Sequence, residues 1–125
     1  MSASISSRGN KGRISLGVSG GVACYKAAEI LRRLQDAGFD VVVLMTRNAT
    51  RFVTPLTFEA LSGGQVYIDL FDGSGSETGL RDPFDHIFLA QSTDIFLVAP
   101  ATANCIARMA AGIADDFMTT FHLAV

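Results

Sequence analysis

The sequence predicts an α/β fold, a three-layer sandwich built around a mostly parallel sheet. Apolar, β-branched runs of strand length alternate with segments of helical periodicity. Two of these runs lead into loops of small residues that open a helix, as in parallel sheets whose connections are helical. Hydrophobic residues make up 49% of the 125 residues and charged residues 18%, which is sufficient for the core of one domain.

Six segments are predicted in the first half of the chain, in the order strand, helix, strand, helix, helix and strand. They span residues 13–18, 22–37, 40–45, 48–52, 56–61 and 65–70. The strand over 40–45 is apolar and β-branched throughout, which is typical of a parallel strand buried on both faces. Gly38 is a helix-stop signal, and Pro55 suits a first helical position.

The second half begins with a predicted surface loop over residues 72–82, which is rich in glycine and serine. Asp82 and Pro83 then indicate a helix start, and that helix is expected to end near Gln91. The remaining predicted segments are a strand over 94–98 and helices over 102–111 and 114–125. This alternation predicts a Rossmann-like (flavodoxin-like) fold.

The domain organisation is predicted to be simple. Residues 1–12 are rich in serine and glycine and lack the apolar stretch of a signal peptide, so we expect a disordered tail. Residues 13–125 form the predicted domain. We expect this domain to be incomplete at its C-terminal end, because the last predicted helix runs to Val125 without a helix-stop signal.

Composition excludes several classes of function. A net charge of −2 with few basic clusters argues against a nucleic-acid binder. The two cysteines, Cys24 and Cys105, are too few for a disulfide framework and lack metal-ligand spacing with the two histidines, so no metal is expected. No apolar stretch has membrane-spanning length. We therefore expect a reducing, cytoplasmic location and no membrane partner.

Two loops carry the strongest functional signal. They are Gly17-Val18-Ser19-Gly20-Gly21-Val22-Ala23 and Ala99-Pro100-Ala101-Thr102-Ala103-Asn104. Both follow predicted strands, so in a parallel sheet they lie at the carboxyl edge, where ligands bind. Gly20 and Gly21 permit close backbone approach, Ser19 adds a hydroxyl, and the following helix start favours an anion. The pattern indicates a nucleotide-type ligand, with a turn that serves only strand-to-helix geometry as the alternative.

Other single residues have two interpretations each. Thr46 follows a strand and either contacts the same ligand or caps the next helix, and Phe52 either packs in the core or flanks a flat ring. His86 lies in a first helical turn that disfavours the imidazolium, and it is either a neutral general base or a packing residue. Cys24 and Cys105 lie just inside helix starts, where a thiol pKa can fall, or are small core residues.

Six motifs occur in an order that resembles one family. They are residues 17–23, Met45-Thr46 with Phe52, Thr54-Pro55-Leu56, Asp85-His86-Ile87 with Leu89, residues 99–104, and Ala110-Ala111-Gly112-Ile113-Ala114-Asp115-Asp116. The chain resembles the flavin-dependent cysteine decarboxylases, the family of phosphopantothenoylcysteine decarboxylase. The similarity is greatest to the decarboxylase half of the bacterial bifunctional coenzyme A enzyme, and it covers residues 13–125.

The resemblance implies an FMN site shared between the subunits of a homotrimer, which sometimes packs into a dodecamer. His86 matches the active-site histidine of the family. The expected FMN contacts, including Ser19 and Phe52 from the residue analysis, are Ser19, Gly20, Gly21, Val22, Thr46, Phe52, Thr102, Ala103, Asn104 and Cys105.

The implied activity is FMN-dependent decarboxylation of 4'-phosphopantothenoylcysteine to 4'-phosphopantetheine in coenzyme A biosynthesis. In this chemistry the flavin oxidises the cysteine of the substrate, the carboxylate leaves as CO2, and the electrons return. The alternatives are a peptidyl-cysteine decarboxylase, a non-catalytic or regulatory flavoprotein, and the related flavin prenyltransferases. Two departures are Cys105, where threonine is usual, and an expected truncation before a Pro-x-Met-Asn motif.

Overall fold

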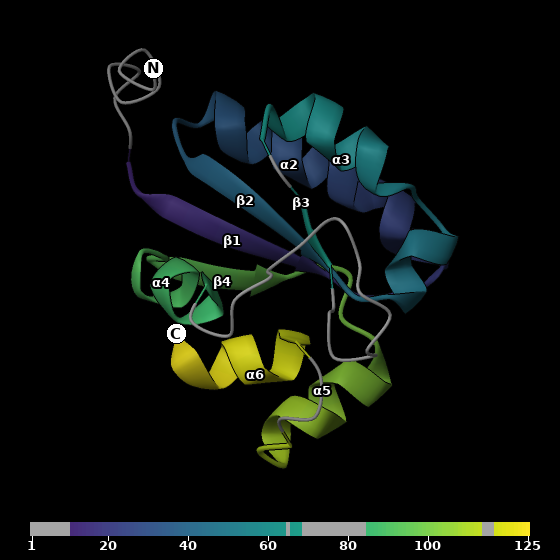
Figure 1. Cartoon of the computed structure of the whole chain (residues 1–125). Coiled ribbons are helices and arrows are strands. Elements are labelled where there is room, and N and C mark those ends of the chain that lie inside the picture. The colour runs from purple at the N-terminus through teal and green to yellow at the C-terminus, as the bar shows by residue number, and fades with distance from the viewer. Residues whose placement is uncertain (1–10, 65, 69–84, 114–116) are drawn as a thin grey trace.

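The structure of the chain is a computed structural model that describes residues 11–64, 66–68, 85–113 and 117–125. Its sheet contains four strands in the order β3-β2-β1-β4, and every pairing is parallel. Figure 1 shows β1 in the middle of this sheet. The strands are β1 Arg13–Val18, β2 Asp40–Met45, β3 Val66–Ile68 and β4 Ile95–Val98.

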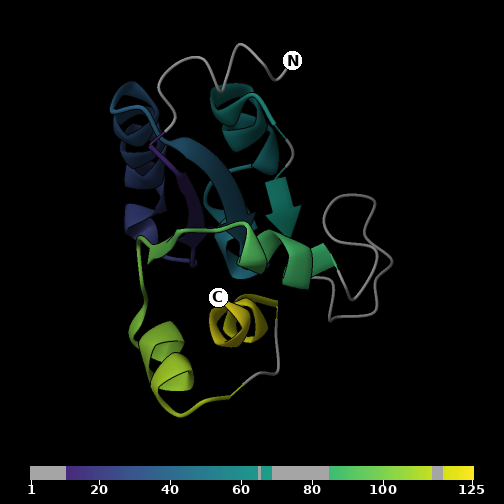
Figure 2. The same ribbon diagram turned by 90° about the vertical axis from the view of Figure 1, so that its left-hand side faces the viewer.

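Helices cover both faces of the sheet, which confirms the predicted Rossmann-like three-layer sandwich. Helices α2 and α3 lie on one face, and α4 and α6 lie on the other, with α5 beyond the end of β4 (Figures 1 and 2). The helical elements are η1 Val22–Tyr25, α2 Lys26–Asp36, η2 Asn48–Arg51, α3 Pro55–Ser62, α4 Asp85–Gln91, α5 Ala103–Ala110 and α6 Phe117–Ala124.

The core is divided by the sheet into two clusters. On one face, Leu31 of α2 and Phe58 of α3 pack against the buried side chains of β1 and β2. On the other face, Phe121 of α6 packs with Leu44 and Leu89, and its ring meets that of Phe96 edge to face at 4.9 Å. Strands covered on both faces explain why β2 is apolar along its whole length.

The observed helices differ from the predicted ones mainly at their ends. The predicted helix over 22–37 begins as the 3-10 turn η1, in which the Cys24 N–H donates to Gly21 at 2.9 Å, and becomes α-helical only at Lys26. The predicted helix over 48–52 is also a 3-10 turn, η2. Residues 1–10 of the predicted tail over 1–12, the loop over 72–82 and the Asp82 cap lie outside the described residues. The last two residues of that tail, Lys11 and Gly12, are described, and each forms a backbone hydrogen bond to the segment that leads into β2.

The order of the strands determines where a ligand can bind. The chain proceeds outward from β1 to β2 and β3, and then returns to place β4 on the other side of β1. The connections therefore diverge at the carboxyl ends of β1 and β4, the switch point at which open α/β sheets bind ligands. Among the helices that the structure describes, none is long and apolar enough to cross a membrane.

Candidate functional site

The candidate site is a cavity of about 200 Å³ at the carboxyl ends of β1, β2 and β4. Six of the ten residues predicted to contact a cofactor line this cavity. They are Ser19, Gly20, Thr46, Thr102, Asn104 and Cys105. The loops behind three different strands therefore meet in one place, as expected at a switch point.

Ser19 joins the loop behind β1 to the loop behind β4. Its hydroxyl donates a hydrogen bond to the carbonyl of Pro100 and accepts one from the backbone N–H of Thr102 at 3.1 Å. The backbone N–H of Ser19 also donates to Pro100, at 3.3 Å. The peptide bond between Ala99 and Pro100 is cis. Because Ser19 is only 2% exposed, water does not compete for these bonds, and the two loops are held at a fixed separation.

Gly20 lies directly against the loop behind β2. A Cβ atom at this position would be 2.5 Å from Nδ2 of Asn48 and 2.9 Å from its backbone carbonyl carbon, which is closer than real Cβ atoms come. Any side chain at position 20 would therefore push the β1 and β2 loops apart. The glycine is required here by close approach and not by an unusual backbone angle, because its φ is not among the positive values.

Two threonines organise the local backbone around the cavity. Thr46 precedes Arg47, the N-cap residue of η2, and its Oγ1 accepts a hydrogen bond from the N–H of Ala49 at 3.1 Å while the residue also lines the cavity. Thr102 is the N-cap residue of α5, and its Oγ1 accepts a hydrogen bond from the N–H of Cys105 at 3.1 Å. The N-terminal end of α5, which carries partial positive charge, therefore opens at the cavity.

The charge of the cavity suits an anion. Two arginines, Arg47 and Arg108, line it together with Asn48 and Asn104. None of the described residues that line it is acidic. Hydroxyls, amides, guanidinium groups and a helix N-terminus are the groups that bind phosphate in proteins.

The other predicted contacts lie away from this cavity. Gly21, Val22, Phe52 and Ala103 do not line it, and Val22 and Phe52 point to solvent, with exposed fractions of 81% and 48%. Val22 and Phe52 follow cavity-lining loop residues in the sequence, and their apolar surface is open to solvent. His86 is in the first turn of the described part of α4, and its side chain lies outside the described part of the chain.

Five residues of the cavity were not among the predicted contacts. Arg47 and Asn48 directly follow the predicted contact Thr46 in the sequence, whereas the other three were missed altogether. Arg108 follows Asn104 by four positions, so helical spacing places both on the same face of α5, and this signal was available. Met118 and Thr119 come from α6. No sequence pattern connects them to the cavity, because only the packing of α6 against α5 and the sheet brings them there.

The structure places the two cysteines differently. Cys24 is fully buried, its Sγ lies 3.9 Å from the Ala49 carbonyl, and burial raises the pKa of its thiol. A lowered pKa for Cys24 is therefore wrong, because desolvation outweighs its position near a helix start. Cys105 lines the cavity and lies close to Met109 and Met118. In the described ranges, no group of three or more His, Cys, Asp or Glu side chains is arranged to hold a metal.

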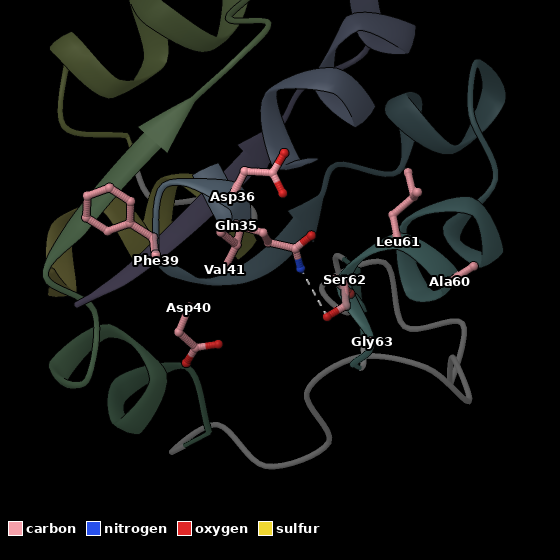
Figure 3. Close-up of a pocket in the computed structure, with 10 residues that line it drawn as sticks. Gln35, Asp36, Phe39, Asp40, Val41, Ala60, Leu61, Ser62 and Gly63 are labelled. Carbon is pink, nitrogen blue, oxygen red and sulfur yellow. Dashed lines mark hydrogen bonds between the residues drawn. The ribbon is translucent and has the colours of Figure 1, made fainter. Parts of the chain in front are cut away.

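A larger cavity, of about 330 Å³, lies at the opposite edge of the sheet, and Figure 3 shows its lining residues. It is placed between the C-terminal ends of α2 and α3 and the start of β2, where Gln35 donates to the carbonyl of Ser62 at 3.3 Å. Its charged side chains are Asp36 and Asp40, and both helices present their negative ends. This cavity disfavours an anion, so we place the candidate site in the smaller one.

Comparison with known proteins agrees with this architecture. The family model described as Flavoprotein matches residues 2–125. The chain belongs to the Flavoprotein family.

This Flavoprotein chain is 47% identical over 112 residues to the coenzyme A biosynthesis bifunctional protein CoaBC of Vibrio vulnificus, and 47% identical over 115 residues to that of Bacillus subtilis. These alignments cover 90% and 92% of the chain but 27% of each relative, so this Flavoprotein chain spans about a quarter of their length.

Solved structures confirm the fold of this Flavoprotein chain. The FMN-dependent cysteine decarboxylase SpaF superposes with a TM-score of 0.76 at 27% identity, covering 92% of this chain and 63% of SpaF. A PPC decarboxylase mutant complexed with pantothenoylaminoethenethiol superposes with a TM-score of 0.69 at 27% identity, covering 92% of this chain and 61% of that one. The resemblance to flavin-dependent cysteine decarboxylases is therefore confirmed.

Proposed function

We propose that this chain is an FMN-binding domain that decarboxylates 4'-phosphopantothenoylcysteine to 4'-phosphopantetheine in coenzyme A biosynthesis. The observation that carries the proposal is the identity of 47% to bifunctional coenzyme A proteins over 112 residues, which is 90% of the chain. The lining of the cavity supports the same proposal independently, since it suits a phosphate monoester such as that of FMN.

The residues that line the cavity fit the phosphate end of FMN. Gly20 leaves a place that a Cβ would fill, and Ser19, Thr102 and Arg108 bring a hydroxyl, a helix start and a positive charge to it. The cavity of about 200 Å³ is below the usual range for small-molecule sites, about 300–1,000 Å³. We infer that it holds the phosphate end of the cofactor and that the flat ring lies outside it.

The exposed apolar residues beside the cavity suggest how the ring is covered. Val22 and Phe52, both expected to contact the cofactor, have exposed fractions of 81% and 48%. A ring lying over these side chains would be open to water on its other face unless a second subunit covered it. We therefore propose a cofactor site completed by a neighbouring subunit, in a homotrimer or a dodecamer, with the cytoplasm as the place of action.

Bound FMN supplies the two-electron redox chemistry that allows CO2 to leave the cysteine end of the substrate. The chain itself contributes binding, orientation and proton transfer. Arg108 and the N-terminus of α5 would hold the phosphate of FMN, and Ser19 keeps the β1 and β4 loops in register. We propose that His86, at the start of α4, moves the proton, as a neutral imidazole near a helix N-terminus can.

The test begins with the purified chain mixed with FMN and then desalted. We expect flavin absorbance at about one FMN per chain, and CO2 release when 4'-phosphopantothenoylcysteine is added. The variant His86→Asn is expected to retain FMN and to lose turnover. A folded chain that retains no flavin contradicts the proposal.

Two further outcomes identify the alternatives. Flavin retention without turnover on any cysteine substrate indicates a non-catalytic or regulatory flavoprotein. Turnover on peptides that end in cysteine, with none on 4'-phosphopantothenoylcysteine, indicates a peptidyl-cysteine decarboxylase. Full activity of His86→Asn contradicts the role of His86 alone and leaves the cofactor assignment in place.

A further inference from the structure

We propose that the larger cavity, between the ends of α2 and α3, binds a small aliphatic amine in its ammonium form, of the size of n-butylamine. Four of its lining residues carry the inference. They are Gln35 and Asp36 at the end of α2, Val41 in β2 and Leu61 at the end of α3. The inference does not rest on the proposed decarboxylase function, because none of these residues lines the cavity at the switch point.

The cavity has the size of a small-molecule site, and its walls are held in place by hydrogen bonds. Its volume of about 330 Å³ lies within the usual range of about 300–1,000 Å³. Gln35 Nε2 donates to the carbonyl of Ser62 at 3.3 Å and ties the end of α2 to the end of α3 (Figure 3). Gly38 and Gly63 follow the two helices with positive φ, and their N–H groups donate back into the last turn of each helix at 3.0 Å. Walls that are ordered before a ligand arrives reduce the entropic cost of binding.

One side of the cavity is apolar. Val41 is only 6% exposed, and Phe39 and Leu61 pack as half-buried side chains against the core cluster of β1, β2, α2 and α3. A short alkyl chain lying on this surface leaves water, and each methylene group that is fully buried raises the affinity about fourfold. The cavity therefore favours a ligand with an apolar body over a bare ion.

The other side of the cavity carries one unmatched negative charge. Asp40 lines the cavity, but its carboxylate lies 2.9 Å from the guanidinium group of Arg13. The carboxylate of Asp36 has no hydrogen bond or ion pair with any residue that the structure describes. The C-terminal ends of α2 and α3 add partial negative charge and outward carbonyl groups. A ligand with a single positive charge would match this charge distribution.

The polar groups of the cavity select an ammonium group. The bond from Gln35 Nε2 to a carbonyl leaves Oε1 of the same amide as an acceptor, next in sequence to the Asp36 carboxylate. An ammonium group has three N–H donors and no acceptor, so it suits a site whose free groups are acceptors. Ca²⁺ instead takes about six or more oxygen ligands. Within the described ranges, no group of three or more His, Cys, Asp or Glu side chains could hold a metal.

The test is a titration of the full chain, labelled with ¹⁵N, with n-butylammonium chloride at low ionic strength. We expect saturable chemical-shift changes at the backbone amides of Gly38 and Gly63, which line the cavity from its two helices. Ser19 and Gly20 at the switch point are expected to keep their shifts. n-Butanol has the same alkyl chain without the charge, and we expect it to bind about fivefold more weakly, the effect of losing one partly exposed ion pair.

A matched pair of variants separates the site from general attraction to an acidic surface. Asp36→Asn keeps the size of the side chain and removes its charge, so we expect n-butylammonium to bind about fivefold more weakly and n-butanol to bind as before. Glu29→Gln removes an exposed carboxylate that lies on the same helix but does not line the cavity, and it is expected to leave both affinities unchanged. Unchanged amide shifts of the core residues verify that each variant is folded.

The apolar side of the cavity is tested by chain length. Ethylammonium has two fewer methylene groups than n-butylammonium, so we expect it to bind more weakly by up to about fourfold for each of them. Three results would overturn the proposal. They are equal affinities for n-butylammonium and n-butanol, equal affinities for the two ammonium ions, and equal weakening by Asp36→Asn and Glu29→Gln.

Discussion

The side-chain oxygen of Ser19 accepts a hydrogen bond from the backbone N–H of Thr102 at 3.1 Å, although the two residues are 83 positions apart in the chain. The bond lies at the switch point of the sheet and connects the loops that follow β1 and β4. Because both loops contribute to the cavity, its shape depends on this hydroxyl together with the backbone bond from Ser19 to Pro100.

Replacing Ser19 by alanine is the most direct test of that dependence. The substitution leaves the N–H of Thr102 without its partner in a site that is 2% exposed. We expect the free energy of unfolding to fall by about 1–3 kcal/mol, the cost of an unsatisfied buried donor, as measured by urea denaturation. Ser92→Ala is the control, because the Ser92 side chain is exposed and water replaces its bonds to Leu89 and Arg13. An equal loss in both variants would contradict this interpretation.

Gly20→Ala tests the close approach between the first two loops. The new methyl group would meet Asn48 at 2.5–2.9 Å, including a backbone atom that cannot rotate away. We expect a loss of about 1–3 kcal/mol in unfolding free energy, as for overpacking, together with weaker FMN binding. Gly64→Ala is matched, because nothing lies within 4 Å of its Cβ position, and it is expected to change stability by no more than about 0.5 kcal/mol. Normal FMN binding by Gly20→Ala would show that the loop contact is not needed.

Arg108→Met tests whether the cavity binds the phosphate of the cofactor. Methionine keeps much of the side-chain length and removes the charge, so we expect the affinity for FMN to fall by about tenfold or more, while the affinity for riboflavin stays the same. Fluorescence titration with both flavins measures the difference. Arg32→Met, on the exposed face of α2, is the control. An equal weakening for both flavins would place the phosphate elsewhere.

The buried thiol of Cys24 predicts a pH dependence of stability. Burial raises the pKa of this thiol above its ordinary value of 9.0, so the unfolded chain loses its proton first as the pH rises. Folding stability contributed by Cys24 is therefore complete below pH 9 and falls above it, with a slope of at most about 1.4 kcal/mol per pH unit. Urea denaturation of the wild type and Cys24→Ala between pH 8 and 10.5 gives the unfolding free energy of each protein at each pH. The contribution of Cys24 is the difference between the two slopes of unfolding free energy against pH. Equal slopes in the two proteins would contradict this prediction.

The sequence was sufficient to predict most of the fold. Apolar runs located all four strands, and the glycines at the ends of α2 and α3 marked where those helices stop. Gly38 and Gly63 both have positive φ, which is the reason that glycine is favoured there. The 3-10 turns could not be predicted, because hydrophobic spacing does not distinguish a 3-10 turn from the first turn of an α-helix.

The candidate site was predictable only in part. Loop composition identified Ser19, Gly20 and Thr102, because small residues and hydroxyls after a strand form a local pattern. The position of Met118 depends on the packing of α6, which no local pattern encodes. Composition also could not show that Val22 and Phe52 lie outside the cavity, because the direction of a side chain depends on the turn geometry of η1 and η2.

The central position of β1 also determines when the site is formed during folding. β2 pairs with β1 across about 27 residues, whereas β4 must close a loop of about 81 residues to reach the other side of β1. Longer loops close more slowly and at greater entropic cost, so β1, β2 and α2 are expected to assemble first. Because the cavity needs the loop behind β4, a chain emerging from the ribosome has most of its sheet before it has any place for a cofactor.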